Sequence, residues 1–74
     1  MSYLPVISAR EVIRALLVIG YQMDHQRGNH VVLRHADPPH RRVTVPNHDP
    51  IAKGTLRNII RETGLTVDEF RDLL

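Results

Sequence analysis

The chain has 74 residues, no cysteine and a formal net charge of +2 at neutral pH. This length predicts a single domain over residues 1–74 and leaves no room for a deep pocket with a lid, so any active site should lie open on the surface. The absence of cysteine excludes a disulfide framework, a thiol nucleophile and thiolate metal ligands.

Neither a leader nor a membrane span is expected. Met1–Pro5 lacks the basic start and apolar run of a signal peptide. The longest apolar run, Ala15–Ile19, is far shorter than the roughly 20 residues that cross a bilayer. We therefore expect a soluble, cytoplasmic protein with no membrane partner.

Basic residues are concentrated in the middle of the chain. Residues 27–61 contain seven basic and two acidic side chains, whereas residues 62–74 contain four acidic and one basic. A basic region within a small domain favours a polyanionic partner such as a nucleic acid. The alternative is a solvated basic surface without a ligand.

The first predicted helix follows Ser8. Ser8 and Glu11 have the spacing of a capping box, and Gly20 is suited to end the helix. Between them the apolar residues recur at helical spacing and predict one buried stripe, formed by Val12, Ile13, Leu16, Leu17 and Ile19.

Three strands are predicted next, at residues 21–26, 30–35 and 41–45. Alternation in the first strand predicts that Tyr21, Met23 and His25 share one half-buried face, opposite Gln22, Asp24 and Gln26. Gly28 allows the tight turn before the second strand, because glycine adopts a positive φ without strain.

The second and third strands each have one apolar face. Val31 and Leu33 point toward the core, which places His30 and Arg34 together on the other face. In the third strand Val43 and Val45 point inward, and Arg42 and Thr44 point outward.

A second helix and a short third helix complete the chain. The second helix begins either at Asp49, as an N-cap before Pro50, or a few residues later near Gly54. Its buried residues are Leu56, Ile59 and Ile60, and Lys53, Arg57 and Arg61 form a basic stripe at four-residue spacing. Gly64 ends it, and a capping box from Thr66 to Glu69 opens the last helix.

This order of elements predicts an α+β fold, α-β-β-β-α with a short C-terminal helix. A three-stranded antiparallel sheet needs one face covered, and the helices can cover it.

The five histidines are candidates for chemistry. A metal site is not supported. The five-residue spacing places neighbouring histidines on opposite faces of a strand or on different strands and loops, and no acidic cluster accompanies them. We expect no role for His25, His35 and His40, and we keep His48 as an outside candidate because it precedes a helix N-terminus. His30 stands out, since it begins a rigid strand on the arginine-bearing face.

Several segments resemble the HicA family of toxin mRNA interferases. They occur in family order and the resemblance extends from about Arg10 to Leu74. The segments are Gly28-Asn29-His30 with residues 31–35, Arg42-Val43-Thr44-Val45-Pro46, Lys53-Gly54-Thr55-Leu56-Arg57-Asn58-Ile59-Ile60 and Gly64-Leu65-Thr66-Val67-Asp68-Glu69-Phe70.

The resemblance implies a fold like that of double-stranded-RNA-binding domains and a metal-independent endoribonuclease without a small-molecule cofactor. It implies that His30 is the catalytic residue and that a HicB-like antitoxin neutralises the toxin. The family motif most often has serine where this chain has Asn29. Asparagine still forms hydrogen bonds and tolerates turn conformations.

The chemistry available fits cleavage of RNA by its own 2′-hydroxyl. His30 can act as acid or base near neutral pH. The side chains expected to bind RNA are Arg27, Asn29, Arg34, Arg42, Lys53 and Arg57. No obvious second acid–base residue is found in the sequence. The alternatives are a non-catalytic RNA-binding module of the same fold and a subunit that acts only by pairing with a partner.

Overall fold

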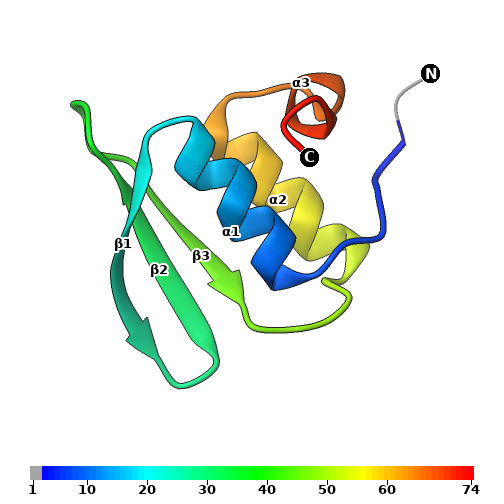
Figure 1. Cartoon of the computed structure of the whole chain (residues 1–74), viewed down its shortest axis with the longest axis horizontal. Helices are drawn as coiled ribbons and strands as arrows, with labels where there is room; N and C mark the ends of the chain where they lie inside the picture. Colours follow the sequence, from blue (N-terminus) through cyan, green and yellow to red (C-terminus); the bar gives the residue numbers. More distant parts are fainter. Residues whose placement is uncertain (1–2) are drawn as a thin grey trace.

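A three-stranded antiparallel sheet with helices packed on one of its faces forms the protein (Figure 1). The computed structural model describes residues 3–74. Met1 and Ser2 lie outside the described residues; they are the first two residues of the segment that was examined above for a signal peptide. The elements are α1 (Ala9–Val18), β1 (Tyr21–Arg27), β2 (His30–His35), β3 (Arg42–Pro46), α2 (Lys53–Thr63) and α3 (Val67–Arg71). The predicted α+β fold and strand order are confirmed.

The core lies between the sheet and the helices. β2 is the central strand, and its Leu33 pairs with Met23 of β1 and Val43 of β3. Val31, Leu33, Val43 and Val45 are buried, together with apolar residues of all three helices. The predicted alternation of β2 and β3 is therefore confirmed, and no element within residues 3–74 covers the opposite face of the sheet.

The boundaries of α1 agree with the sequence. Ser8 and Glu11 form the predicted capping box. At the other end Gly20 has a φ of 100°, which side-chain-bearing residues rarely adopt. A Cβ at this position would also lie 2.8 Å from Nε2 of His35, so the site requires glycine for two reasons. Leu17, expected in the buried stripe, is 47% exposed.

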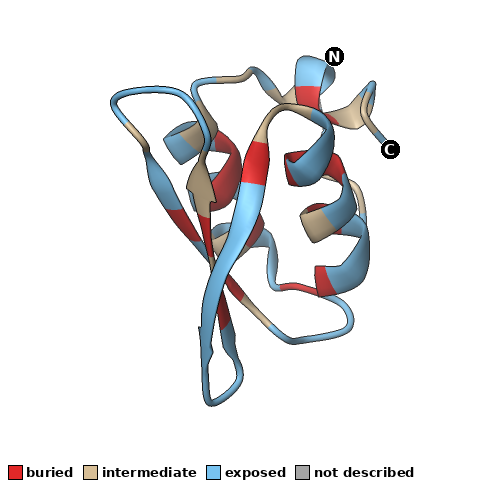
Figure 2. Cartoon of the chain, turned by 60° about the vertical axis from the view of Figure 1, so that its left-hand side comes forward, coloured by how far each residue is buried: buried red, intermediate tan, exposed pale blue. Residues whose placement is uncertain are grey.

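The alternation predicted for β1 is wrong beyond Met23. The pairing with β2 shifts between Met23 and His25, so Asp24 is an extra, bulged residue. His25 therefore pairs with Val32, on the face away from the helices, instead of sharing the face of Tyr21. Only Tyr21 is buried in this strand, because the far half of the β1–β2 hairpin extends beyond the helices (Figure 2).

The start of α2 follows the later of the two predicted positions. The helix begins at Lys53 after Ala52, which makes no side-chain capping bond, and Asp49 is not its N-cap. The segment before it pairs with the chain ahead of α1: the Ile51 amide donates to the Ile7 carbonyl at 2.9 Å. Ile51 is buried there, so these residues are held in non-helical backbone until Ala52.

The C-terminal part agrees with the sequence. Gly64 ends α2 in the left-handed conformation, and Thr66 and Glu69 form the capping box of α3. Phe70 of α3 is fully buried against the core. Within residues 3–74, no helix is long and apolar enough to cross a membrane.

Candidate active site

The sheet face away from the helices, called the open face below, is mainly polar and basic. The strand register assigns side chains to it, because directly opposed residues share a face. Its members are Gln22, His25, Arg27, His30, Val32, Arg34, Arg42, Thr44 and Pro46. Val32 and Arg34 are partly buried, whereas the other polar members are exposed.

His30 occupies one end of the open face. It is exposed, begins β2 directly after the two-residue turn Gly28–Asn29, and pairs with Arg27 and Pro46 on the two neighbouring strands. The turn is anchored, because the Asn47 amide donates to the Asn29 carbonyl at 2.6 Å. His30 is thus held on a rigid backbone while its ring remains accessible.

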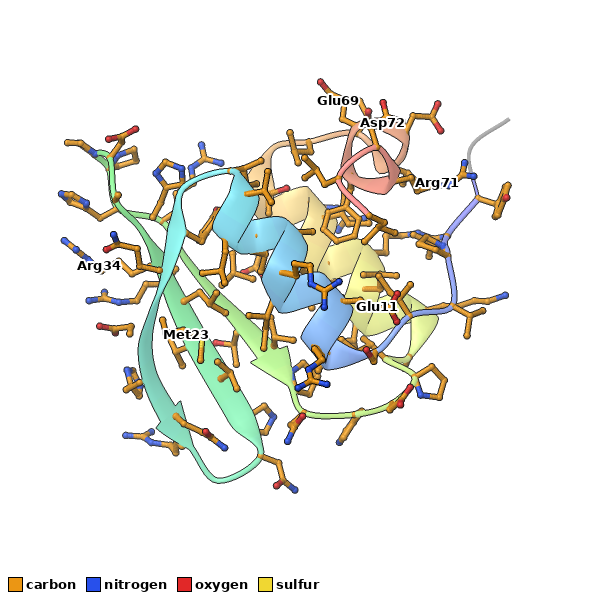
Figure 3. All side chains as sticks on the ribbon, in the orientation of Figure 1. Glu11, Met23, Arg34, Glu69, Arg71 and Asp72 are labelled. Atoms are coloured by element: carbon orange, nitrogen blue, oxygen red, sulfur yellow. The ribbon has the colours of Figure 1, made fainter. Side chains whose placement is uncertain are left out.

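Three arginines share this face with His30. Arg27 is directly opposite His30, whereas Arg34 and Arg42 are opposite one another, four residues further along β2, which is roughly 13 Å away. Arg34 projects away from the helices (Figure 3). Like charges directly opposite one another are unfavourable in a sheet. Asp24, 3.7 Å from Nε of Arg42, partly offsets this repulsion. Such a pair of guanidinium groups is suited to bind a phosphate.

The basic stripe of α2 is separate from this group. Lys53, Arg57 and Arg61 are exposed along α2. Because α2 packs against the covered side of the sheet, the strand register does not bring these residues beside His30. The predicted RNA-binding residues therefore divide into three arginines on the open face (Arg27, Arg34 and Arg42), Asn29 in the turn beside it, and a helix group with Lys53 and Arg57.

His35 has a structural position. The Asp37 amide donates to its Nδ1 at 3.0 Å, so Nε2 carries the proton and donates to the Ile19 carbonyl at 2.7 Å. Its ring contacts Tyr21 edge to face, with centroids 4.9 Å apart. His35 thus ties the end of α1 to β2.

The remaining histidines differ in their surroundings. His40 has a φ of 59° and donates from Nδ1 to the His35 carbonyl. His48 is exposed, and its carbonyl accepts from the Ala9 amide. His25 is exposed and lies 3.0 Å from the Asp24 carboxylate. Across residues 3–74, no three histidine or acidic side chains converge as metal ligands would.

A shallow depression of about 200 Å³ lies at the other end of β2 from His30. Its walls include Tyr21, His35, Asp37 and Arg41. Burial raises the pKa of Tyr21 above its usual value of 10.0, while the charge of Arg41 acts in the opposite direction and Glu62 adds to the rise. This depression contains none of the predicted site residues.

Comparison with protein families identifies the chain. Residues 9–65 match the family described as "HicA toxin of bacterial toxin-antitoxin". The chain belongs to the HicA toxin family. It is therefore a toxin of a toxin–antitoxin system, and an antitoxin is its expected partner. The matched range contains His30 and the arginines of the open face. Comparison with curated proteins gives no significant match.

Proposed function

We propose that this toxin is an endoribonuclease that cleaves mRNA in the cytoplasm, with residues 1–74 acting as one domain and His30 as its catalytic residue. The HicA family consists generally of toxin endoribonucleases. The observation that carries the proposal is the position of His30: exposed, rigidly held and directly opposite Arg27 on a basic face.

The proposed reaction uses the nucleophile that RNA itself carries. The 2′-hydroxyl attacks its neighbouring phosphorus, one group accepts the hydroxyl proton, and another protonates the leaving 5′-oxygen. An imidazole can perform either proton transfer near neutral pH, which typically contributes about 100- to 10,000-fold in rate. Because guanidinium groups can stabilise the charge on the phosphate, the mechanism needs neither a metal ion nor another cofactor.

RNA binding is assigned to the basic groups around this centre. Arg27 and the Asn29 side chain flank His30 and would contact the reacting phosphate. Arg34 and Arg42 would hold a phosphate further along the strand. Lys53 and Arg57 would continue the contact on α2, around the side of the molecule, if the RNA bends.

The proposed partner is a HicB-like antitoxin that blocks access to RNA by covering His30 and the basic stripe of α2. Histidine- and arginine-modifying reagents applied to the free toxin and to the complex test this. We expect strong protection of His30 and Arg57 in the complex. Unchanged reactivity at both would contradict this binding mode.

The central experiment compares the wild type with His30→Ala and with His48→Ala as a control histidine. Each variant is induced in bacteria, and growth and RNA decay are followed; purified protein is then incubated with RNA in the presence of EDTA. We expect arrest and cleavage for wild type and His48→Ala, and at least about a 100-fold slower cleavage for a folded His30→Ala.

Two other outcomes would identify the alternatives. RNA binding without cleavage by any of the three proteins would indicate a non-catalytic RNA-binding module. Absence of RNA binding even at low salt would indicate a subunit that acts only through a protein partner.

A further inference from the structure

A second histidine shares the open face with His30. The two-residue turn sets Arg27 opposite His30, and the same register sets His25 opposite Val32, two residues along β2 from His30. Positions in this diagonal relation across an antiparallel pair are about 7–8 Å apart. That separation lets two imidazole rings contact opposite sides of one phosphate group.

His25 is oriented by a carboxylate. Its Nδ1 lies 3.0 Å from Oδ2 of Asp24, so the ring donates from Nδ1 and its Nε2 is left free to face a ligand. The same carboxylate oxygen lies 3.7 Å from Nε of Arg42, which reaches over from β3. The side chain of His25 is 52% exposed and that of Asp24 is 34% exposed, so the Asp24–His25 pair is accessible but partly sheltered.

We propose that His25 is the second acid–base residue of RNA cleavage, acting with His30 across the same phosphate. This inference rests on the proposed function. Neutral His30 accepts the proton of the 2′-hydroxyl as its oxygen forms a bond to phosphorus. The bond from phosphorus to the 5′-oxygen breaks, and protonated His25 donates its Nε2 proton to that oxygen. The products are a 2′,3′-cyclic phosphate and a free 5′-hydroxyl.

The roles of the two rings follow from their surroundings. Asp24 accepts a hydrogen bond from Nδ1 of His25 and so orients the ring with its Nε2 toward the ligand. His30 lies opposite Arg27, whose guanidinium can bind the same phosphate while His30 accepts the proton of the 2′-hydroxyl. Bulges often re-aim a side chain next to an active site. Here the bulge allows Tyr21 to be buried on the covered face while His25 lies on the face of His30.

The test uses an RNA oligonucleotide with one cleavable linkage, and a second one whose bridging 5′-oxygen is replaced by sulfur. A thiolate leaves without being protonated, so the sulfur substrate bypasses the need for an acid. We expect His25→Gln to slow cleavage of ordinary RNA by about 100-fold or more. We expect the sulfur substrate to recover most of that loss. His30→Ala should be slow on both substrates, because the 2′-hydroxyl still needs a base.

Two further variants separate chemistry from folding. Asp24→Asn keeps a hydrogen-bond acceptor but removes the charge, and it should slow ordinary RNA more than the sulfur substrate. Val18→Ala, at an exposed position of α1 on the other side of the sheet, should cleave both substrates like wild type. Thermal melts of all variants show whether the hairpin is intact.

The outcomes distinguish the inference from the proposed function. If wild type cleaves RNA, His30→Ala does not, and folded His25→Gln matches wild type, then His25 has no part in the chemistry. Equal loss on both substrates would also overturn the role of His25 as acid. If wild type itself leaves RNA intact, the proposed function fails instead.

Discussion

His35 is predicted to stabilise the fold without taking part in RNA cleavage. His35→Ala removes the hydrogen bonds to the Ile19 carbonyl and from the Asp37 amide, and the edge-to-face contact with Tyr21. Each hydrogen bond contributes about 1 kcal/mol, and the aromatic contact about 0.5–1.5 kcal/mol. The expected loss in free energy of unfolding is about 2–4 kcal/mol. For a chain of this size that lowers Tm by roughly 10–30 °C.

Chemical denaturation and thermal melts followed by circular dichroism measure this loss. His48→Ala is the matched control, because His48 is exposed and its structural contact runs through its backbone; we expect a change within about 0.5 kcal/mol. At a temperature where His35→Ala is folded, its RNA cleavage should match wild type. A loss below about 0.5 kcal/mol would refute the assignment of His35 as the link between α1 and β2.

Three further predictions test the fold and the open face. Gly20→Ala should destabilise more than Gly28→Ala, because a Cβ at Gly20 meets His35 whereas nothing lies within 4 Å at Gly28; equal losses in denaturant melts would contradict this. The raised pKa of Tyr21 favours the neutral phenol in the folded state, so wild-type stability is fully present below about pH 10 and falls as the pH rises further. Tyr21→Phe should remove that alkaline loss, and melts from pH 8 to 11 would show it. Arg34→Ala should weaken RNA binding and reduce the slope of log affinity against log salt by about 0.7–0.9, with no loss of stability; an unchanged slope would exclude a phosphate contact.

The boundaries of most elements followed from local chemistry. The capping box of α1 depends only on Ser8, Glu11 and the backbone between them, and Gly64 ends α2 for an equally local reason. The alternation of Val31 and Leu33 predicted the covered face of β2, and with it the exposure of His30 on the other face. These features could be predicted because each is determined by neighbours within a few residues.

Other features depended on partners distant in sequence. Ile51 is held against Ile7, more than forty residues earlier in the chain, and this delays the start of α2 beyond Asp49. No role could be predicted for His35 from the sequence, because its hydrogen-bond partner, the Ile19 carbonyl, lies at the end of α1. Neither contact has a signal in the local pattern of residues.

The surroundings of His30 also combine features determined by neighbouring residues with features determined by contacts between elements. The sequence by itself determined that His30 begins a strand after a tight turn, and that Arg34 shares its face, because side chains alternate along every strand. It also favoured the family to which the chain belongs. Only the pairing of β1 with β2 decided that Tyr21 and His25 lie on opposite faces of the sheet. A bulge is defined by two residues opposing one on the neighbouring strand, so it exists in the pairing of β1 with β2 and not in either strand alone.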